Sequence, residues 1–289
     1  MPEPKPDPRE GPTVIRKILG MQLRRLRESR GLSAEQAAAK IRGSVSKINR
    51  IELGKSAVKE IDVSDLLQAY GVDPAEREQL LGLAEQANLP GWWHNYSDIL
   101  PPWFESYIGL EESARQLRVY EPMFVPGLLQ TPQYAAAVLS LGDFSAADTE
   151  RHVMLRKERQ RRFIDGFLRL WVVVDETALR RPVGSEEVLR DQLRYLVSLC
   201  SRHNLTIQIT PQGAGGHAAP NAFTILRFEE QEMPDIVYVE QLTSALYLDK
   251  RQDVDRYMLA WDRLAMISGR PEETQGFLLS IISHLEART

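Results

Sequence analysis

The sequence predicts an α+β protein of two domains: an all-α domain of five short helices, then a mixed α/β domain in which helices cover a small sheet. Three observations lead to this prediction. Residues 13–88 show only helical apolar periodicity, interrupted by glycine-centred turns. Residues 106–289 alternate helical patterns with runs rich in Val, Ile and aromatic residues, which are typical of buried strands. The length of 289 residues accommodates two domains.

The composition is that of an ordinary globular chain, with 43% hydrophobic and 26% charged residues. No stretch approaches the roughly 20 apolar residues that a membrane span needs. Residues 1–12 contain five prolines and no apolar core, so we expect a disordered tail rather than a signal peptide. The single cysteine, Cys200, cannot form an internal disulfide. This favours a reducing cytoplasm.

The net charge of −4 conceals a strong asymmetry along the chain. Residues 13–59 hold twelve Lys and Arg against three acids, a net charge of +9, whereas residues 60–88 have a net charge of −6. Only the first of these segments would attract a polyanion. A solvated helical surface would show the same charges, so charge alone does not decide between the two.

The first two of the five helices begin and end at clear signals. Apolar residues at helical spacing over residues 15–26 predict a first helix, which Gly31 ends by supplying a left-handed residue. Ser33, with Gln36 three positions later, forms a capping box. It begins a short helix whose alanines allow another helix to approach closely.

The other three helices complete the domain, which we place at residues 13–88. Ser44 caps a third helix that runs to about residue 53, and Gly54 ends it. Residues 62–70 and 74–87 form two more amphipathic helices. Five short helices with a tight turn between the second and third are the layout of a helix-turn-helix domain.

The run LRRLRESRGLSAEQAAAKIRGSVSKINRIELGK resembles the helix-turn-helix of the xenobiotic-response-element family. The resemblance implies a transcriptional regulator that binds double-stranded DNA and is not an enzyme. Gly43 departs from the pattern, because relatives usually carry a bulky apolar residue there. We therefore expect a looser turn and weaker apolar support beneath the third helix.

In such domains the third helix lies in the major groove, with its N-terminal residues at base edges. Three side chains are then candidates for base contacts: Val45 against a thymine methyl, Ser46 as donor or acceptor, and Asn49 paired with adenine. Contacts to phosphates, which position the helix without reading sequence, are expected from Ser33, Arg42, Ser44, Lys47, Arg50 and Lys55.

Arg27 and Glu52 resemble the internal ion pair that ties the third helix to the first in this family. A buried carboxylate needs a partner, so a structural role is favoured over contact with DNA.

Residues 89–105 are predicted to be a linker. Its aromatic residues could stack on bases or could pack the linker onto the domains. No basic residue interleaves Trp92, Trp93, Tyr96 and Trp103, which favours packing.

The second domain is expected over residues 106–289. Residues 107–120 have helical spacing, and two further helices follow, the second of them basic. Strands are predicted at residues 170–176, 205–210, 222–228 and 236–240, with a helix at 185–201 and two amphipathic helices at the end. We expect the last two helices to form a dimer interface.

The segments YEPMFVPGLLQTPQYA, VVVDETALRRPVG, ITPQGAGGHAAPNAFTILRF and IVYVE resemble successive signatures of an actinobacterial group. In that group the same helix-turn-helix is joined to a C-terminal antitoxin-like domain. The resemblance implies a regulator, as in toxin–antitoxin systems, whose C-terminal domain binds a small protein encoded nearby. Residues 220–223 depart from the pattern, since relatives more often have Gly-Pro before the phenylalanine. We expect a cytoplasmic homodimer that is associated with the nucleoid when bound to DNA.

Other readings remain open. The alternative function is a small-molecule-sensing repressor, with a pocket lined by residues 213–223 and 92–103. The basic helix Arg151–Arg162 could be a second DNA contact, could pair within the chain, or could dock an acidic partner.

An enzyme, a metal site and a cofactor are not expected. The five histidines lack metal-ligand spacing, and the GAGG run precedes a strand rather than a helix. Cys200 and His203 would share a helix face only if the helix continued past them. Asp175 and Glu176 could be acid–base residues or could cap the following helix.

Overall fold

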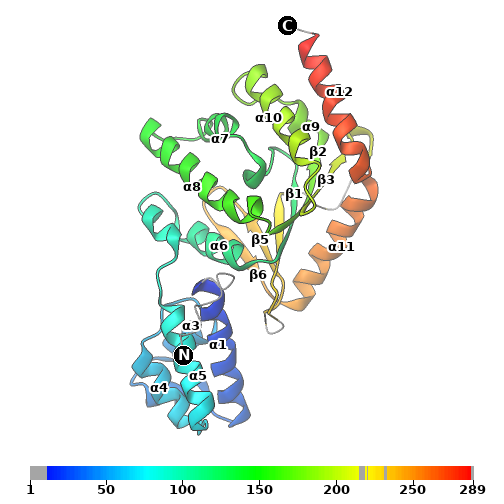
Figure 1. Cartoon of the computed structure of the whole chain (residues 1–289). Coiled ribbons are helices and arrows are strands. Elements are labelled where there is room, and N and C mark those ends of the chain that lie inside the picture. The colour runs from blue at the N-terminus through cyan, green and yellow to red at the C-terminus, as the bar shows by residue number, and fades with distance from the viewer. Residues whose placement is uncertain (1–11, 215–218, 220, 231–232, 288–289) are drawn as a thin grey trace, which may run out of the picture. The chain divides into compact units, whose positions relative to one another are not determined.

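The computed structural model describes residues 12–214, 219, 221–230 and 233–287. Apart from Pro12, the predicted tail lies outside these residues, as do Gly215 and Gly216 of the GAGG run and Pro220. The chain divides into two compact units (Figure 1). Unit 1 holds the described residues of Met1–Asn95, Glu105–Ser113 and Glu230–Met233, and unit 2 those of Tyr96–Phe104, Ala114–Glu229 and Pro234–Thr289.

The N-terminal region is helical, and its five predicted helices are confirmed. They are α1 (Pro12–Ser29), α2 (Ala34–Lys40), α3 (Val45–Glu52), α4 (Glu60–Ala69) and α5 (Pro74–Ala87), followed by the 3-10 helix η1 (Trp92–Tyr96) and by α6 (Pro102–Ser113). The predicted glycine signals hold, since Gly31 has a φ of 65° and Gly54 a φ of 63°. Among the described residues, no helix has the length and apolar character needed to span a bilayer.

The core of this region lies between α1, α3, α4 and α5. Leu19 and Leu23 of α1 meet Ile48 of α3, Leu66 of α4 and Leu80 of α5, and each of these five is at most 2% exposed. The alanine-rich α2 adds only small side chains, which allows α3 and α4 to approach it closely.

Gly20 lets the backbone of α1 lie directly against the end of α3. A Cβ on Gly20 would lie 2.4 Å from the carbonyl oxygen of Ile51 and 2.7 Å from that of Glu52. Gly54, just past α3, is equally close, because its Cβ would lie 2.7 Å from the Cα of Lys17. Two glycines thus set the distance between α1 and α3.

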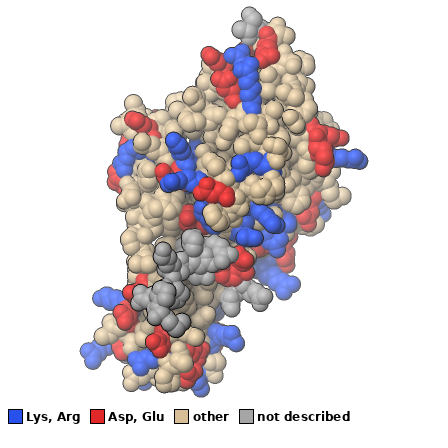
Figure 2. Space-filling model, in the orientation of Figure 1, with Lys and Arg blue, Asp and Glu red and all other residues tan. Residues whose placement is uncertain are grey.

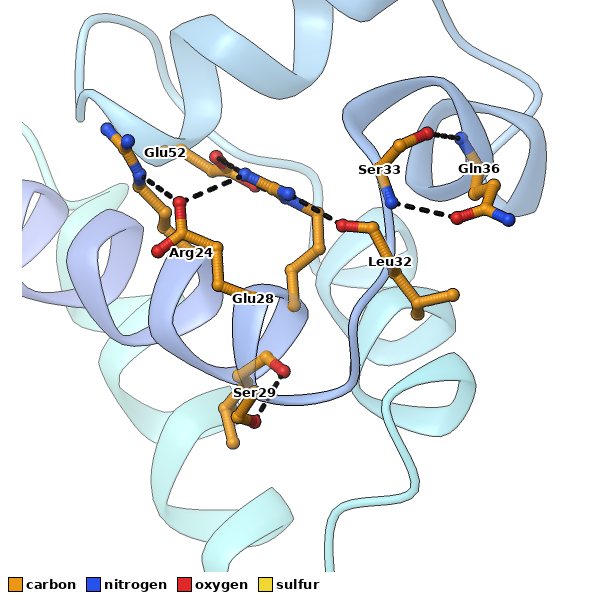
Figure 3. A network of polar contacts seen from close by, with 9 residues as sticks. Arg24, Glu28, Ser29, Leu32, Ser33, Gln36 and Glu52 are labelled. Atoms are coloured by element: carbon orange, nitrogen blue, oxygen red, sulfur yellow. Dashed lines mark hydrogen bonds and ion pairs between the residues drawn. The ribbon is translucent and has the colours of Figure 1, made fainter.

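The ion pair between Arg27 and Glu52 joins the same two helices. Arg27 Nε donates to Glu52 Oε1 at 2.6 Å, and its Nη2 donates to Oε2 at 2.9 Å. Its Nη1 donates to the carbonyl of Leu32 at 2.7 Å, so the guanidinium also holds the turn into α2. The pair is buried, with Arg27 9% and Glu52 6% exposed. Figure 3 shows this network beside the exposed pair of Arg24 and Glu28.

The larger C-terminal region contains one six-stranded sheet and its helices. The elements are β1 (Gln116–Glu121), η2 (Gly127–Leu129), α7 (Pro132–Leu139), α8 (Ala146–Ile164), β2 (Arg169–Asp175), α9 (Glu176–Arg180), α10 (Glu186–Leu199), β3 (Leu205–Thr210), η3 (Gln212–Ala214), β4 (Phe223–Arg227), β5 (Ile236–Glu240), β6 (Ala245–Leu248), α11 (Arg251–Ile267), η4 (Pro271–Glu273) and α12 (Thr274–Glu286).

The strand order is β3-β2-β1-β4-β5-β6. The first three strands in this order are parallel, and β4, β5 and β6 are antiparallel to their neighbours. Helix α11 covers one face, where Trp261 and Leu264, both 0% exposed, pack on Val173, Phe223 and Val237. Figure 1 shows α8 on the other side of the sheet from α11. The predicted α+β class, with a helical first domain and a helix-covered sheet, is therefore confirmed.

One predicted element is wrong. The pattern over residues 107–120 was expected to be helical, but the helix ends at Ser113 and residues 116–121 form β1 in the middle of the sheet. Leu117 keeps helical spacing with Ala114, but it also alternates with Val119 as in a strand. Pairing with β2 on one side and β4 on the other decides the outcome, because it satisfies the backbone of β1 on both edges.

We predict that Gly20→Ala destabilises the helical region by about 1–3 kcal/mol, because the new Cβ overlaps backbone that cannot move away cheaply. Gly82→Ala is the matched control. A Cβ there meets nothing within 4 Å, and alanine should stabilise α5 by about 0.5–1 kcal/mol. Urea unfolding of the full-length chain, followed by circular dichroism, measures both. If both variants shift the midpoint in the same direction, the close approach is contradicted.

Glu52→Gln should cost about 3–5 kcal/mol, because it leaves the Arg27 guanidinium buried without its counter-charge. Arg24→Gln removes one partner of the exposed pair in Figure 3, and it should cost no more than about 0.5 kcal/mol. The double variant Arg27→Met/Glu52→Met should recover most of the loss, since it leaves no buried charge. The same unfolding measurement applies, and equal costs for Glu52→Gln and Arg24→Gln would contradict the role of the buried pair.

Candidate nucleic-acid interface

Helix α3 has one buried face and one exposed polar face. Ile48 and Ile51 are 0% and 2% exposed and anchor the helix in the core. Ser46, Asn49 and Arg50 are exposed and lie three or four positions apart, so they share the opposite face. Of the three predicted base-contact residues, Ser46 and Asn49 are thus available to a ligand, and Val45 is half-buried beside them.

Both helices of the turn are capped as predicted. Ser44 Oγ accepts the backbone N–H of Lys47 at 3.2 Å, which starts α3. At the start of α2, Ser33 Oγ accepts the N–H of Gln36 at 3.2 Å, and Gln36 Oε1 accepts the N–H of Ser33 at 2.8 Å. The helix start at Ser33 was expected to point backbone N–H groups at a phosphate, and those of Ser33 and Gln36 are already bonded within the capping box.

The turn between α2 and α3 puts its left-handed residue one position before Gly43. Arg42 has a φ of 51°, and it is the one non-glycine residue with positive φ in the described part of the chain. Ile41, 6% exposed, supplies the apolar side chain beneath α3. A Cβ on Gly43 would lie 3.0 Å from Lys47 Cδ and 3.3 Å from Ile41 Cδ1. The space beside Gly43 is thus already filled by its neighbours.

The cations around α3 fall into two groups. Arg42, Arg50 and Lys55 are exposed, and none forms an ion pair with another described residue. Lys47, by contrast, pairs with Asp62 in the first turn of α4, with Nζ 2.7 Å from Oδ2. The Asp62 side chain is only 9% exposed. Lys47, expected to contact a phosphate, is therefore engaged in tying α3 to α4.

Sequence reasoning missed this second ion pair. The available signal was an acid in the first turn of a helix, which the helix dipole favours, but nothing in the spacing links residue 62 to residue 47. On the face that Figure 2 shows, Lys and Arg side chains lie interspersed with Asp and Glu. Charge alone therefore does not mark out a single basic patch on that face.

The basic helix α8 is largely engaged within unit 2. Arg151 forms a bidentate pair with Asp98, and its Nη2 donates to Oδ1 at 2.8 Å. Arg156 donates to the side chain of Gln130. The guanidinium of Arg159 lies 5.0 Å from the ring centroid of Phe104. These contacts favour intramolecular pairing, one of the three readings of this helix, over a second DNA contact.

The tryptophans before α6 pack against the protein and are not exposed for stacking on bases. Trp93 is 4% exposed, and its ring meets that of Trp92 edge-on at 5.9 Å. Trp92 Nε1 donates to Glu112 Oε2 at 3.0 Å. A buried ring cannot stack on a base, so Trp93 is packed, and the hydrogen bond to Glu112 favours packing for the half-buried Trp92 as well.

The residues considered for catalysis have structural roles in the described part of the chain. Asp175 caps α9 by accepting the N–H of Thr177 at 2.8 Å, and Glu176 pairs with Arg180 at 2.6 Å. Burial raises the pKa of the Cys200 thiol, which lowers its reactivity, and the thiol donates to the Leu196 carbonyl. No group of three potential metal ligands occurs among the described residues.

Comparison with known proteins matches two segments of the chain to family models. A helix-turn-helix domain model matches residues 18–80, and the family described as "Domain of unknown function (DUF5753)" matches residues 104–280. Searches of the curated proteins and of the solved structures found no match. The helix-turn-helix domain indicates a DNA-binding regulator rather than an enzyme. The second family model covers more than half of the length of this chain, so the chain belongs to the DUF5753 family.

Proposed function

We propose that this chain is a sequence-specific transcriptional regulator that reads DNA with the exposed face of α3. The observation that carries the proposal is the arrangement of α3 itself. Its apolar face is anchored by Ile48 and Ile51, and its polar face presents Ser46 and Asn49. A rigidly held helix with two hydrogen-bonding side chains on one exposed face matches the requirements for reading a major groove.

The proposed division of labour follows from exposure and pairing. Asn49 and Ser46 contact base edges, and Val45 contacts a thymine methyl. Arg42, Arg50 and Lys55 contact phosphates, because their charges are exposed and lack ion-pair partners among the described residues. The hydroxyl of Ser44 and the first turn of α2 after Ser33 add neutral phosphate contacts.

Two-fold binding completes the proposal. One recognition helix reads only a few base pairs, so we propose a homodimer on half-sites about 34 Å apart. The apolar face of α12, which we expected to dimerise, is engaged inside unit 2. Leu278, Ile281 and Leu285 are at most 7% exposed, and α12 packs on α10. These three side chains are therefore not available to a dimer interface.

The resemblance to antitoxin-like proteins supports a role for the C-terminal domain. We propose that this domain binds a small protein and thereby changes the affinity of α3 for DNA. This proposal for the C-terminal domain has its own test. The full-length chain is purified by affinity from its own cells, and its DNA binding is measured with and without the small protein that it retains. An unchanged DNA affinity would contradict it.

The DNA proposal is tested by selecting bound sequences from random duplexes with the full-length chain. Binding of the selected duplex is then measured by fluorescence anisotropy at two salt concentrations. We expect two-fold symmetric sites and an affinity that falls as salt rises. Failure to bind any duplex at low salt would overturn the proposal.

We predict that Asn49→Ala and Arg50→Ala weaken binding in different ways. Asn49→Ala should cost about 1–3 kcal/mol on the selected site and relax the preference at one base pair. Arg50→Ala should weaken selected and unrelated duplexes alike and flatten the slope of log K against log salt by about 1. Identical behaviour of the two variants would show that the assignment of base and phosphate contacts is wrong.

Lys47→Gln should leave the salt slope nearly unchanged, because Asp62 already neutralises this ammonium group. Arg50→Gln is the matched comparison, and it should reduce the slope by about 0.9, the value for one phosphate contact. Lys47→Gln should instead lower the stability of the helical region, since the carboxylate of Asp62 loses its partner. If Lys47→Gln flattens the slope as much as Arg50→Gln does, Lys47 leaves Asp62 for a phosphate on binding.

A further inference from the structure

A pocket of about 280 Å³ lies in unit 2. It is found between α11 and the end of the sheet at which β4 begins and β5 ends. One wall is formed by Asn221, Ala222 and Phe223, and the other by one face of α11. The alternative function, a small-molecule sensor, placed a pocket between residues 213–223 and 92–103. The observed pocket uses the first of these segments, but no residue of 92–103 lines it.

The inner wall of the pocket is aromatic, and Tyr257 is its more exposed ring. Phe223 is 3% exposed, and its ring centroid lies 5.1 Å from that of Tyr257 on α11. Trp261, which is 0% exposed, stands behind them with its ring centroid 6.4 Å from that of Phe223. Phe223 and Trp261 belong to the core of the sheet and Tyr257 packs against them, so the aromatic wall is in place before any ligand binds.

The rim of the pocket is positively charged. Arg256 and Arg263 both line it and are exposed, and no lining residue is acidic. They are seven positions apart on α11, about 10 Å along the helix axis, and so lie on the same face. Neither forms an ion pair with another described residue.

The nearby acids of α11 are directed to other arginines. Asp262 lies 3.8 Å from Arg118, and Asp255 lies 3.8 Å from Arg251. Arg256 and Arg263 thus form no ion pair with these acids, and both stand at the mouth of the cavity. A guanidinium pair at this spacing favours an anion that can meet both side chains.

We propose that this pocket binds a small aromatic acid, with its ring against Tyr257 and its anionic group between Arg256 and Arg263. The exposed side chain of Asn221 lines the pocket and can add a neutral hydrogen bond. The volume suits a compact ligand, since it lies near the lower end of the range for small-molecule sites, about 300–1,000 Å³. Binding here is a property of unit 2 and does not depend on DNA recognition by α3.

The test uses two dyes that differ in one anionic group. The anionic dye is 8-anilinonaphthalene-1-sulfonate, and the neutral one is N-phenyl-1-naphthylamine. Each is titrated by fluorescence into the full-length chain without DNA. The double variant Arg256→Gln/Arg263→Gln should weaken binding of the anionic dye about tenfold, equivalent to about 1.4 kcal/mol. It should leave binding of the neutral dye unchanged.

Ala260→Phe tests the cavity itself, because Ala260 lines the pocket and a larger side chain would fill it. Both dyes should bind at least tenfold more weakly to this variant. Arg251→Gln is the matched control on the same helix, since Arg251 is exposed and does not line the pocket. Circular dichroism confirms that each variant is folded.

Three results would overturn the proposal. If Arg251→Gln weakens the anionic dye as much as the double variant does, the dye responds only to the overall charge. If Ala260→Phe leaves both dyes unchanged, they bind elsewhere. Loss of the neutral dye alone in Ala260→Phe would indicate an apolar surface suited to a protein partner, and the anion site would be wrong.

Discussion

The contact between α1 and the end of α3 determines how the recognition helix is held. Gly20 and Gly54 allow the two backbones to meet, and the buried pair of Arg27 and Glu52 then fixes their relative rotation. The glycines and the ion pair are both needed to hold α3 in place. A larger residue at Gly20 would push α3 away, and a missing charge would leave its partner without solvation. The exposed face of α3 keeps its direction because its opposite face is anchored in this way.

The ion pairs of this region illustrate why position matters more than charge. Arg27, Lys47 and Arg50 are all basic residues within the positively charged segment, and by composition they are equivalent. Arg27 is buried against Glu52, Lys47 is paired with Asp62, and only Arg50 remains exposed without an ion pair among the described residues. Electrostatic attraction of a polyanion depends on the charges that remain free, so the count of basic residues overstates the number of cations available to one. The same holds for α8, whose arginines contact Asp98, Gln130 and Phe104.

The sheet of the second unit combines a pocket with a buried acid. The face under α11 is closed by Trp261 and its aromatic neighbours, and the pocket opens where that packing ends at Phe223. Glu121, at the end of the central strand β1, is a second feature of this edge. Burial raises its pKa to about 8, and the negative charge of Glu240 adds to the effect. A carboxyl group whose pKa is higher in the folded than in the unfolded chain stabilises the fold at a pH below the unfolded-state pKa. That contribution is lost as the pH rises through the folded-state pKa of about 8.

Local signals in the sequence determined much of the helical domain. Ser33 with Gln36, Ser44, Gly31 and Gly54 each act within one helical turn, so the helix ends could be predicted without any knowledge of tertiary contacts. The resemblance of the motif added two expectations: the pair of Arg27 and Glu52, and a third helix that lies in the major groove of DNA.

The tertiary structure decided whatever depends on residues far apart in the chain. Lys47 meets Asp62, and Gly20 meets Ile51, through packing that no spacing reveals. Residues 116–121 satisfy two periodicities, and only pairing with β2 and β4 makes them a strand. The pocket is of the same kind, because Phe223 and Tyr257 come together only once α11 lies on the sheet. Capping energies are local and readable from the sequence, whereas packing and ion pairing depend on which segments the fold brings together.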